Sequence, residues 1–131
     1  MTMNERRFHV ILDPDAEKEY LRLDNSVVGI INDAIDRLEE RADEIGNLLF
    51  NHQNTKLTGC KEIKLRSAGI RIVFMISNQV VRVLQVVYIL TIERRSRDQV
   101  FKIAHKRYEE YKEDPTASLN QGKERPKGRR K

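Results

Sequence analysis

Residues 64–74, KLRSAGIRIVF, have the pattern of a tight β-hairpin that carries cations on one face. Gly69 can supply the positive φ that a hairpin turn needs, so a two-residue loop is predicted at Ala68-Gly69. In this register Arg66 lies directly opposite Arg71. Side chains alternate between the two faces of a strand, so four apolar residues are directed to the core: Ile63, Leu65, Ile72 and Phe74. The opposite face then carries Lys64, Arg66 and Arg71.

Two arginines placed opposite each other in a hairpin repel one another. An anion bound between them, such as a phosphate, would remove that repulsion because guanidinium groups bind phosphate oxygens in a bidentate manner. Alternatively, the two side chains extend into solvent and bind nothing. The pattern leaves both interpretations open.

The segment before the hairpin predicts one strand and two helices. Apolar residues at 8–12 indicate a strand, and Asp13 followed by a proline is typical of a helix start, which predicts a helix over 14–23. Ser26 is the predicted N-cap of a second helix that ends near Ala42, because apolar residues recur there at helical spacing. The two helices form a hairpin that can cover one sheet face. Residues 43–59 are less regular.

The segment after the hairpin predicts two further elements. Asn78-Gln79 is the predicted turn into an apolar strand over 80–90, a basic loop follows at 91–97, and Asp98 is the predicted N-cap of a last helix. The order β-α-α-β-β-β-α indicates an α+β fold with an antiparallel sheet of about four strands. The helical hairpin covers one face of this sheet, and the C-terminal helix completes the domain. The uncovered face is the expected functional surface.

The chain divides into a folded domain over 1–114 and a basic tail over 115–131 that is predicted to be disordered. The tail contains proline, glycine, serine and cations but almost no apolar residues. Either the tail uses its cations to contact a polyanion such as RNA, or it is a solvated extension. An RNA contact of this kind would weaken as salt increases.

Charge is distributed unevenly along the chain. Residues 1–51 hold 6 Lys/Arg and 12 Asp/Glu, whereas residues 52–111 hold 12 Lys/Arg and 5 Asp/Glu, so the two parts carry −6 and +7. This polarity favours a polyanionic partner that meets one face of the protein. Chance clustering of charges is the alternative.

The single cysteine, Cys60, cannot form an internal disulfide, and the first seven residues lack the apolar segment of a signal peptide. No apolar run approaches the length needed to cross a membrane. These features predict a cytoplasmic protein. Cys60 is interpreted as structural, with a nucleophilic role as the alternative. No His, Asp and Glu residues stand at ligand spacing, so neither a metal nor a cofactor is predicted.

Three blocks carry a family resemblance: residues 56–59 (KLTG), 63–74 (IKLRSAGIRIVF) and 93–101 (ERRSRDQVF). Together with the order of elements, they resemble the RelE toxins of the RelE/ParE superfamily over about residues 7–111. The resemblance implies the toxin of a type II toxin–antitoxin system. Such a toxin is a ribosome-dependent endoribonuclease that inhibits translation by cleaving mRNA in the A site. The reaction implied is metal-independent attack by the 2′-hydroxyl.

The resemblance also assigns roles to individual residues. Arg71 and Arg95 are matched to stabilisation of the scissile phosphate, and Lys64 is matched to stabilisation of the transition state or to proton transfer. Such roles suit the chemistry, because a pentacoordinate phosphorane needs cations and its formation needs a base. Arg66 and Arg97 match additional basic positions that contact RNA.

Glu62 and Phe101 depart from the family pattern, because RelE has a lysine and a tyrosine there. Glu62 lies on the same face as Lys64, so it is either a general base or the partner of a nearby cation in an ion pair. Phe101 can stack on a nucleobase but cannot transfer a proton. His105, one helical turn further on, and Lys61 are also predicted to contact RNA, although a solvated or core-edge histidine is the alternative for His105.

These departures leave three functions open. The chain is an active mRNA-cleaving toxin with rearranged proton transfer, a weak or inactive relative that still binds RNA or the ribosome, or a ParE-like inhibitor of DNA gyrase. A cluster of Lys64, Arg71 and Arg95 is expected of the nuclease and is not needed by a gyrase inhibitor. The expected partners are the ribosome, mRNA and a cognate antitoxin that wraps the domain in a hetero-oligomer.

Overall fold

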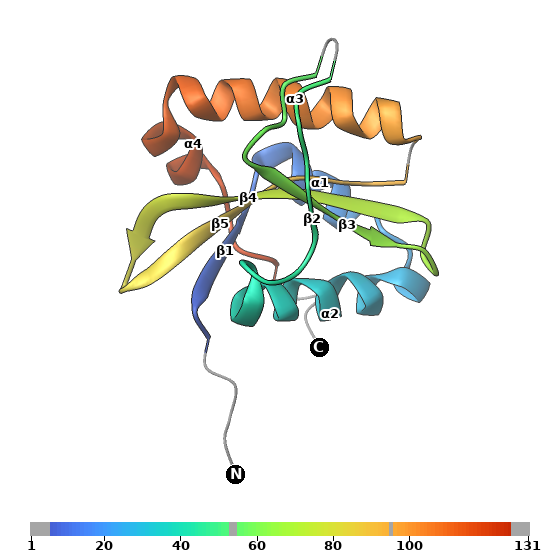
Figure 1. Cartoon of the computed structure of the whole chain (residues 1–131). Helices are drawn as coiled ribbons and strands as arrows, with labels where there is room; N and C mark the ends of the chain where they lie inside the picture. Colours follow the sequence, from blue (N-terminus) through green and yellow to red (C-terminus); the bar gives the residue numbers. More distant parts are fainter. Residues whose placement is uncertain (1–5, 53–54, 95, 127–131) are drawn as a thin grey trace.

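The computed structural model, which describes residues 6–52, 55–94 and 96–126, places one sheet between helices (Figure 1). Helix α2 lies below the sheet in this view, α3 lies above it, and α1 lies behind. In chain order the elements are β1 (Phe8–Leu12), α1 (Pro14–Leu21), α2 (Asn25–Arg41), β2 (Asn47–Leu48), β3 (Cys60–Leu65), β4 (Ile70–Val81), β5 (Leu84–Glu93), α3 (Arg97–Glu113) and α4 (Pro115–Gln121).

The sheet has five strands in the order β1-β5-β4-β3-β2. Strand β1 pairs with β5 in parallel, and every other neighbouring pair is antiparallel. The predicted α+β class is therefore confirmed. The predicted order gains two elements, the short strand β2 before the hairpin and helix α4 after α3. The prediction of a purely antiparallel sheet of about four strands is corrected, because β1 is parallel and the short β2 adds a strand. No helix among the described residues is long and apolar enough to cross a membrane.

Both faces of the sheet are covered, whereas the sequence predicted one free face. Apolar side chains of α2 pack on one face, around the buried Ile72, Phe74 and Ile89. Helix α3 packs on the other face, through Val100, Ala104 and Tyr111. Strands β4 and β5 are apolar on both faces, as expected of strands buried between two layers. A functional surface is therefore confined to the ends and edges of the sheet.

The β3–β4 hairpin has a different register from the one predicted. Leu65 pairs with Ile70 and Lys64 pairs with Arg71, so residues 66–69 form a four-residue turn. A two-residue turn of type I′ needs positive φ at both positions, which is unfavourable for alanine. In the longer turn only Gly69 takes a positive φ, at 66°, and Ala68 is buried in the core. The predicted core residues of the hairpin do face α2.

The predicted turn at Asn78-Gln79 is wrong, because β4 continues to Val81. The chain reverses instead at Arg82 and Val83, which both take positive φ values, 50° and 63°. Positive φ is rare for these residue types, so the sequence gives no signal for this turn. Likewise, β5 extends to Glu93 into the predicted basic loop.

Helices α2 and α3 begin slightly earlier than predicted. Ser96, not Asp98, is the N-cap of α3 and forms a capping box with Gln99. Helix α2 begins at Asn25 after Asp24, which makes no side-chain cap hydrogen bond, so Ser26 lies inside the helix. Asp13 is the N-cap of α1, as predicted, and accepts hydrogen bonds from two backbone N–H groups.

The C-terminal segment is ordered over residues 115–126, so the prediction of a disordered tail is wrong there. Helix α4 is followed by two backbone hydrogen bonds between Lys123 and Leu12, which join the segment to the end of β1. Gly122 fits tightly, since a Cβ atom would lie 2.5 Å from Ile11 Cγ2. Arg125 is buried against α2, so its charge is not available to RNA. The basic residues 127–131 lie outside the described residues.

Candidate functional site

Four cations surround a shallow depression at the end of the β3–β4 hairpin. The depression has a volume of about 210 Å³ and is lined by the hairpin together with the first residues of α3. We call it the cationic depression, and its charged lining residues are Lys64, Arg66, Arg71 and Arg97. Charge of one sign in a concave site attracts anions, so the depression is suited to a phosphate.

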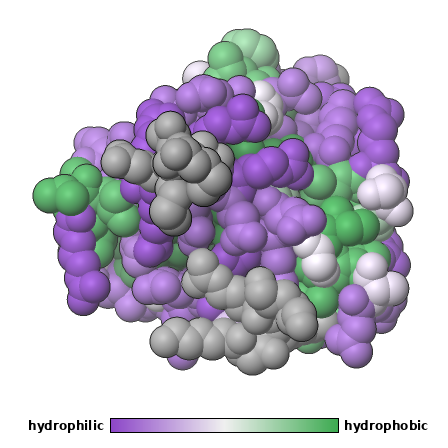
Figure 2. Space-filling model, turned by 90° about the horizontal axis from the view of Figure 1, so that it is seen from below, coloured by the Kyte–Doolittle hydropathy of each residue, from purple (hydrophilic) through white to green (hydrophobic). Residues whose placement is uncertain are grey.

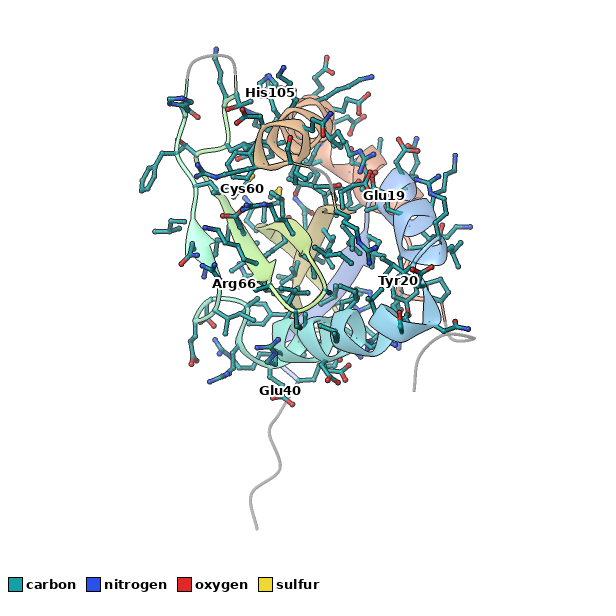
Figure 3. All side chains as sticks on the ribbon, turned by 90° about the vertical axis from the view of Figure 1, so that its right-hand side faces the viewer. Glu19, Tyr20, Glu40, Cys60, Arg66 and His105 are labelled. Carbon is teal, nitrogen blue, oxygen red and sulfur yellow. The ribbon has the colours of Figure 1, made fainter. Side chains whose placement is uncertain are left out.

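The strand register places Lys64 and Arg71 side by side on the face that α3 covers. Arg71 is also paired with Glu93 on β5, so across the three strands Arg71 lies between Lys64 and Glu93. Arg66 belongs to the turn, not to the ladder, and is exposed. Figure 3 shows it at the outer end of the hairpin. The predicted Arg66–Arg71 pair is thus replaced by a Lys64–Arg71 pair, while all three cations still share one depression.

Glu62 forms an ion pair with Arg71, with 2.9 Å between Glu62 Oε2 and Arg71 Nη1. The Glu62 side chain is only 2% exposed, whereas Arg71 is 26% exposed. The carboxylate therefore lies behind the guanidinium and holds it toward the depression. Two roles were predicted for Glu62. The structure shows the ion pair with a nearby cation. The role of general base stays a prediction.

Arg97 connects the cationic depression to a second, larger cleft. Its guanidinium carbon lies 4.8 Å from the centre of the Phe101 ring, which is a cation–π contact. The second cleft has a volume of about 510 Å³ and lies between α3 and the segment after β2. We call it the aromatic cleft, and its lining residues include Leu48, Phe50, Asn51, Arg97, Phe101 and Lys102.

The wall opposite α3 is formed by residues 48–52 and Thr55, and we call the two described segments 48–52 and 55–58 the arm. Asn51 and Thr58 exchange two hydrogen bonds of 3.1 Å across its base. The arm is also attached to α3, because the His105 ring accepts a hydrogen bond from the backbone N–H of Lys56 at 3.0 Å, and Figure 3 shows His105 on this side of the helix. The Tyr108 hydroxyl adds a hydrogen bond to the Thr58 carbonyl. His105 thus supports the arm, and a direct contact with RNA stays a prediction.

A buried ion cluster fixes α3 relative to the rest of the domain. Arg107 contacts both carboxylate oxygens of Glu19, with distances of 3.0 and 2.9 Å. It also donates to the Leu90 carbonyl, and its Nε lies 3.8 Å from Asp13. Glu19 accepts further hydrogen bonds from Thr91 and the backbone of Ile92. This cluster connects α1, β5 and α3, so it holds the helix that carries Arg97 and Phe101.

One predicted RNA contact lies away from the depression. Lys61 lies on the α2 side of the sheet, where its ammonium donates to the Ala42 carbonyl at 3.2 Å. Arg95 lies outside the described residues. Glu93 and Phe50, by contrast, were not singled out from the sequence. Glu93 falls in the predicted basic loop over 91–97 and Phe50 in the less regular stretch over 43–59, and nothing in either segment indicates which side chains share a site.

Cys60 is fully buried beneath α3, as Figure 3 shows. Burial raises the pKa of its thiol to about 12. Because the thiolate is the reactive form, we expect no reaction with a disulfide reagent such as dithionitrobenzoate at pH 8 in the native protein. The same measurement in urea should give one thiol per chain. Rapid reaction of the native protein would instead support the nucleophilic alternative.

A metal site is not apparent in the part of the chain that the structure describes, where no three His, Cys, Asp or Glu side chains could share an ion. The site formed by the described residues is thus a cationic depression that adjoins an aromatic cleft.

No family model and no curated protein matches the chain. Two solved structures of the E. coli toxin RelE do match. The first is a free-state variant with two arginine-to-alanine substitutions, 26% identical, with a TM-score of 0.57, covering 79% of this chain and 98% of RelE. The second is the isolated toxin, also 26% identical, with a TM-score of 0.50, covering 76% and 96%. This chain has a RelE-type toxin fold.

Proposed function

We propose that this protein is the toxin of a type II toxin–antitoxin system and a ribosome-dependent endoribonuclease that cleaves mRNA in the A site. The similarity to RelE supports a toxin of this kind. The observation that carries the nuclease activity is the cationic depression, because it gathers Lys64, Arg71 and Arg97 at one accessible point. An inhibitor that acts only by binding a protein would not need this cluster.

The proposed reaction uses only groups of the RNA and the protein. The 2′-oxygen attacks the adjacent phosphorus, the bond to the 5′-oxygen breaks, and the products are a 2′,3′-cyclic phosphate and a 5′-hydroxyl. Charge builds up on the phosphorane oxygens during the attack, and Arg71 together with Arg97 would stabilise it. Lys64 would stabilise the same charge or supply a proton to the leaving 5′-oxygen. Arg95 is proposed as a further phosphate contact.

Proton removal from the 2′-hydroxyl is where this chain differs from RelE. Glu62 is buried behind Arg71, so it would act as a positioning residue unless the arginine moves away. Phe101 has no hydroxyl, and His105 points its Nδ1 at the arm. This arrangement also supports the second candidate, a relative that binds RNA or the ribosome but cleaves slowly.

The test is cleavage of an mRNA on programmed ribosomes with an empty A site. We expect cuts within the A-site codon by the wild-type protein. We expect Lys64→Ala to lower the single-turnover rate by about 100-fold, because it removes one cation from the transition state. Circular dichroism would show that the variant remains folded, since Lys64 is exposed.

Three other results would change the assignment. Ribosome binding without cleavage would favour the inactive RNA-binding relative. Lack of ribosome binding together with inhibition of DNA supercoiling would favour the gyrase inhibitor. Failure of the chain to bind a co-encoded small protein would count against the proposed antitoxin and the hetero-oligomer that they would form.

A further inference from the structure

We propose that Glu93 is the general base of the cleavage reaction, with Lys64 as the acid on the opposite side of the scissile phosphate. The inference rests on the proposed function and names the group that removes the proton from the attacking 2′-hydroxyl. Glu93 ends β5, and its Cα position pairs with that of Arg71 on β4. Lys64 on β3 pairs with Arg71 from the other side, so the three residues form a row across three strands.

The side chains of this row lie on the face of the sheet that α3 covers. Ile72 and Ile92, the neighbours of Arg71 and Glu93 along their strands, pack in the core under α2. Since side chains alternate along a strand, Arg71 and Glu93 point to the other face. Opposite residues of antiparallel strands have Cβ atoms about 4.5–5.5 Å apart, so the Glu93 carboxylate can contact a group bound at Arg71.

Glu93 is accessible to a substrate, in contrast to the other carboxylate beside Arg71. Its side chain is half-buried, whereas Glu62 is 2% exposed and its Oε2 atom lies 2.9 Å from Arg71 Nη1. A general base must come within hydrogen-bond distance of the hydroxyl whose proton it takes. Glu93 meets this requirement from the surface, while Glu62 fixes the arginine from below.

The order of the row suits the in-line geometry of the reaction. The attacking 2′-oxygen and the leaving 5′-oxygen lie on opposite sides of the phosphorus, so the base and the acid must flank the group that binds the phosphate. Arg71 lies in the middle of the row, with a carboxylate on one strand and an ammonium on the other. Two strand spacings, about 10 Å in all, leave room for both oxygens and a hydrogen bond to each.

Each proton has a defined donor and acceptor in this scheme. Glu93 takes the proton of the 2′-hydroxyl while the 2′-oxygen forms its bond to phosphorus. The bond between phosphorus and the 5′-oxygen breaks, and the Lys64 ammonium gives that oxygen a proton. The protonated carboxyl and the neutral amine then return to their starting charges by exchanging protons with water.

The test compares two mRNAs on programmed ribosomes, one with the ordinary 5′-oxygen at the scissile bond and one with sulfur in its place. A thiolate leaves without a proton, because a thiol is a much stronger acid than an alcohol. Glu93→Gln should be about 100-fold slower than the wild type on both mRNAs, since both need the base. Lys64→Ala should show its loss of about 100-fold on the oxygen substrate and come within about tenfold of the wild type on the sulfur substrate.

The dependence of the rate on pH separates a general base from a residue that only positions Arg71. The wild-type rate should rise from acid pH and level off once the carboxylate base is ionised. In Glu93→Gln the rate should keep rising without levelling off, because hydroxide then removes the proton.

Glu40→Gln is the matched control and should keep the wild-type rate and pH profile. Glu40 is also a half-buried glutamate, but it lies on α2, on the opposite side of the sheet (Figure 3). Figure 2 shows this side of the molecule, whose surface is mostly hydrophilic.

The possible failures are distinguishable. A Glu93→Gln variant that cleaves at the wild-type rate, or that is slow but levels off with pH as the wild type does, would overturn the assignment of the base and leave the proposed function standing. Equal losses for Lys64→Ala on both mRNAs would overturn its assignment as the acid. If the wild type cuts neither mRNA, the proposed function is wrong and this inference falls with it.

Discussion

Replacing Arg71 with alanine should lower the rate of mRNA cleavage on programmed ribosomes by at least about 100-fold. Arg71 is a partly buried cation that lines the depression, with Lys64 beside it and Glu62 fixing its guanidinium group. A donor fixed in advance stabilises developing charge without reorganisation, which is why removing one such donor has a large effect. Single-turnover kinetics with saturating ribosomes would measure the chemical step separately from binding.

The same substitution should also destabilise the fold, because it leaves the Glu62 carboxylate buried without its cation. We expect the free energy of unfolding to fall by about 2–3 kcal/mol. The double variant Glu62→Gln/Arg71→Ala removes the uncompensated charge and should recover most of that stability. It should remain as slow in cleavage as Arg71→Ala, since the cation at the phosphate is still missing.

This pair of variants separates catalysis from folding. Arg37→Ala is a suitable control, because Arg37 is an exposed cation on α2, on the opposite side of the sheet, and should retain full activity. Wild-type cleavage by Arg71→Ala would contradict the assignment of the site. Recovery of cleavage in the double variant would mean that the loss in Arg71→Ala came from destabilisation.

The sequence predicts the fold class well because its two periodicities are strong. Alternation along residues 63–74 and helical spacing along α2 each place their apolar residues on one face, and the structure confirms both. The turns were predicted less well, since turn geometry depends on tertiary fit. Ala68 enters the core and lengthens one turn, while Arg82 and Val83 adopt positive φ without any of the usual turn residues.

The candidate site likewise has a part that the sequence predicts and a part that depends on tertiary contacts. Cations on the hairpin were placed on one surface from strand alternation, and a change of register did not separate them, because all of them lie near the turn. Phe50 could not be predicted as part of a cleft. Its position depends on hydrogen bonds between the arm and a helix about 50 residues later in the chain, which leave no local pattern.

The second large expected effect concerns the stability of the fold, which depends on the C-terminal segment. Composition predicts disorder, because residues 115–131 contain almost nothing apolar, but the described part, residues 115–126, makes polar contacts with the domain. The Arg125 guanidinium donates to the Asn32 carbonyl at 3.0 Å and to Asp36 at 2.7 Å. Tyr20 donates to the Asn32 side chain as well, so the arginine closes a buried polar network between the C-terminal segment and the two N-terminal helices.

Arg125→Ala should therefore lower the free energy of unfolding by about 3 kcal/mol, because it removes the buried guanidinium that joins the C-terminal segment to Asn32 and Asp36 of α2. For a domain of this size the melting temperature should fall by roughly 10 °C, which thermal denaturation followed by circular dichroism can measure. A chain ending at Pro126 lacks the last five residues but keeps Arg125, and it should melt within about 2 °C of the full chain. A chain ending at Asp114 should be at least as unstable as Arg125→Ala, since it also loses α4 and the hydrogen bonds to Leu12. Equal melting temperatures for all four proteins would mean that the segment adds nothing to the fold.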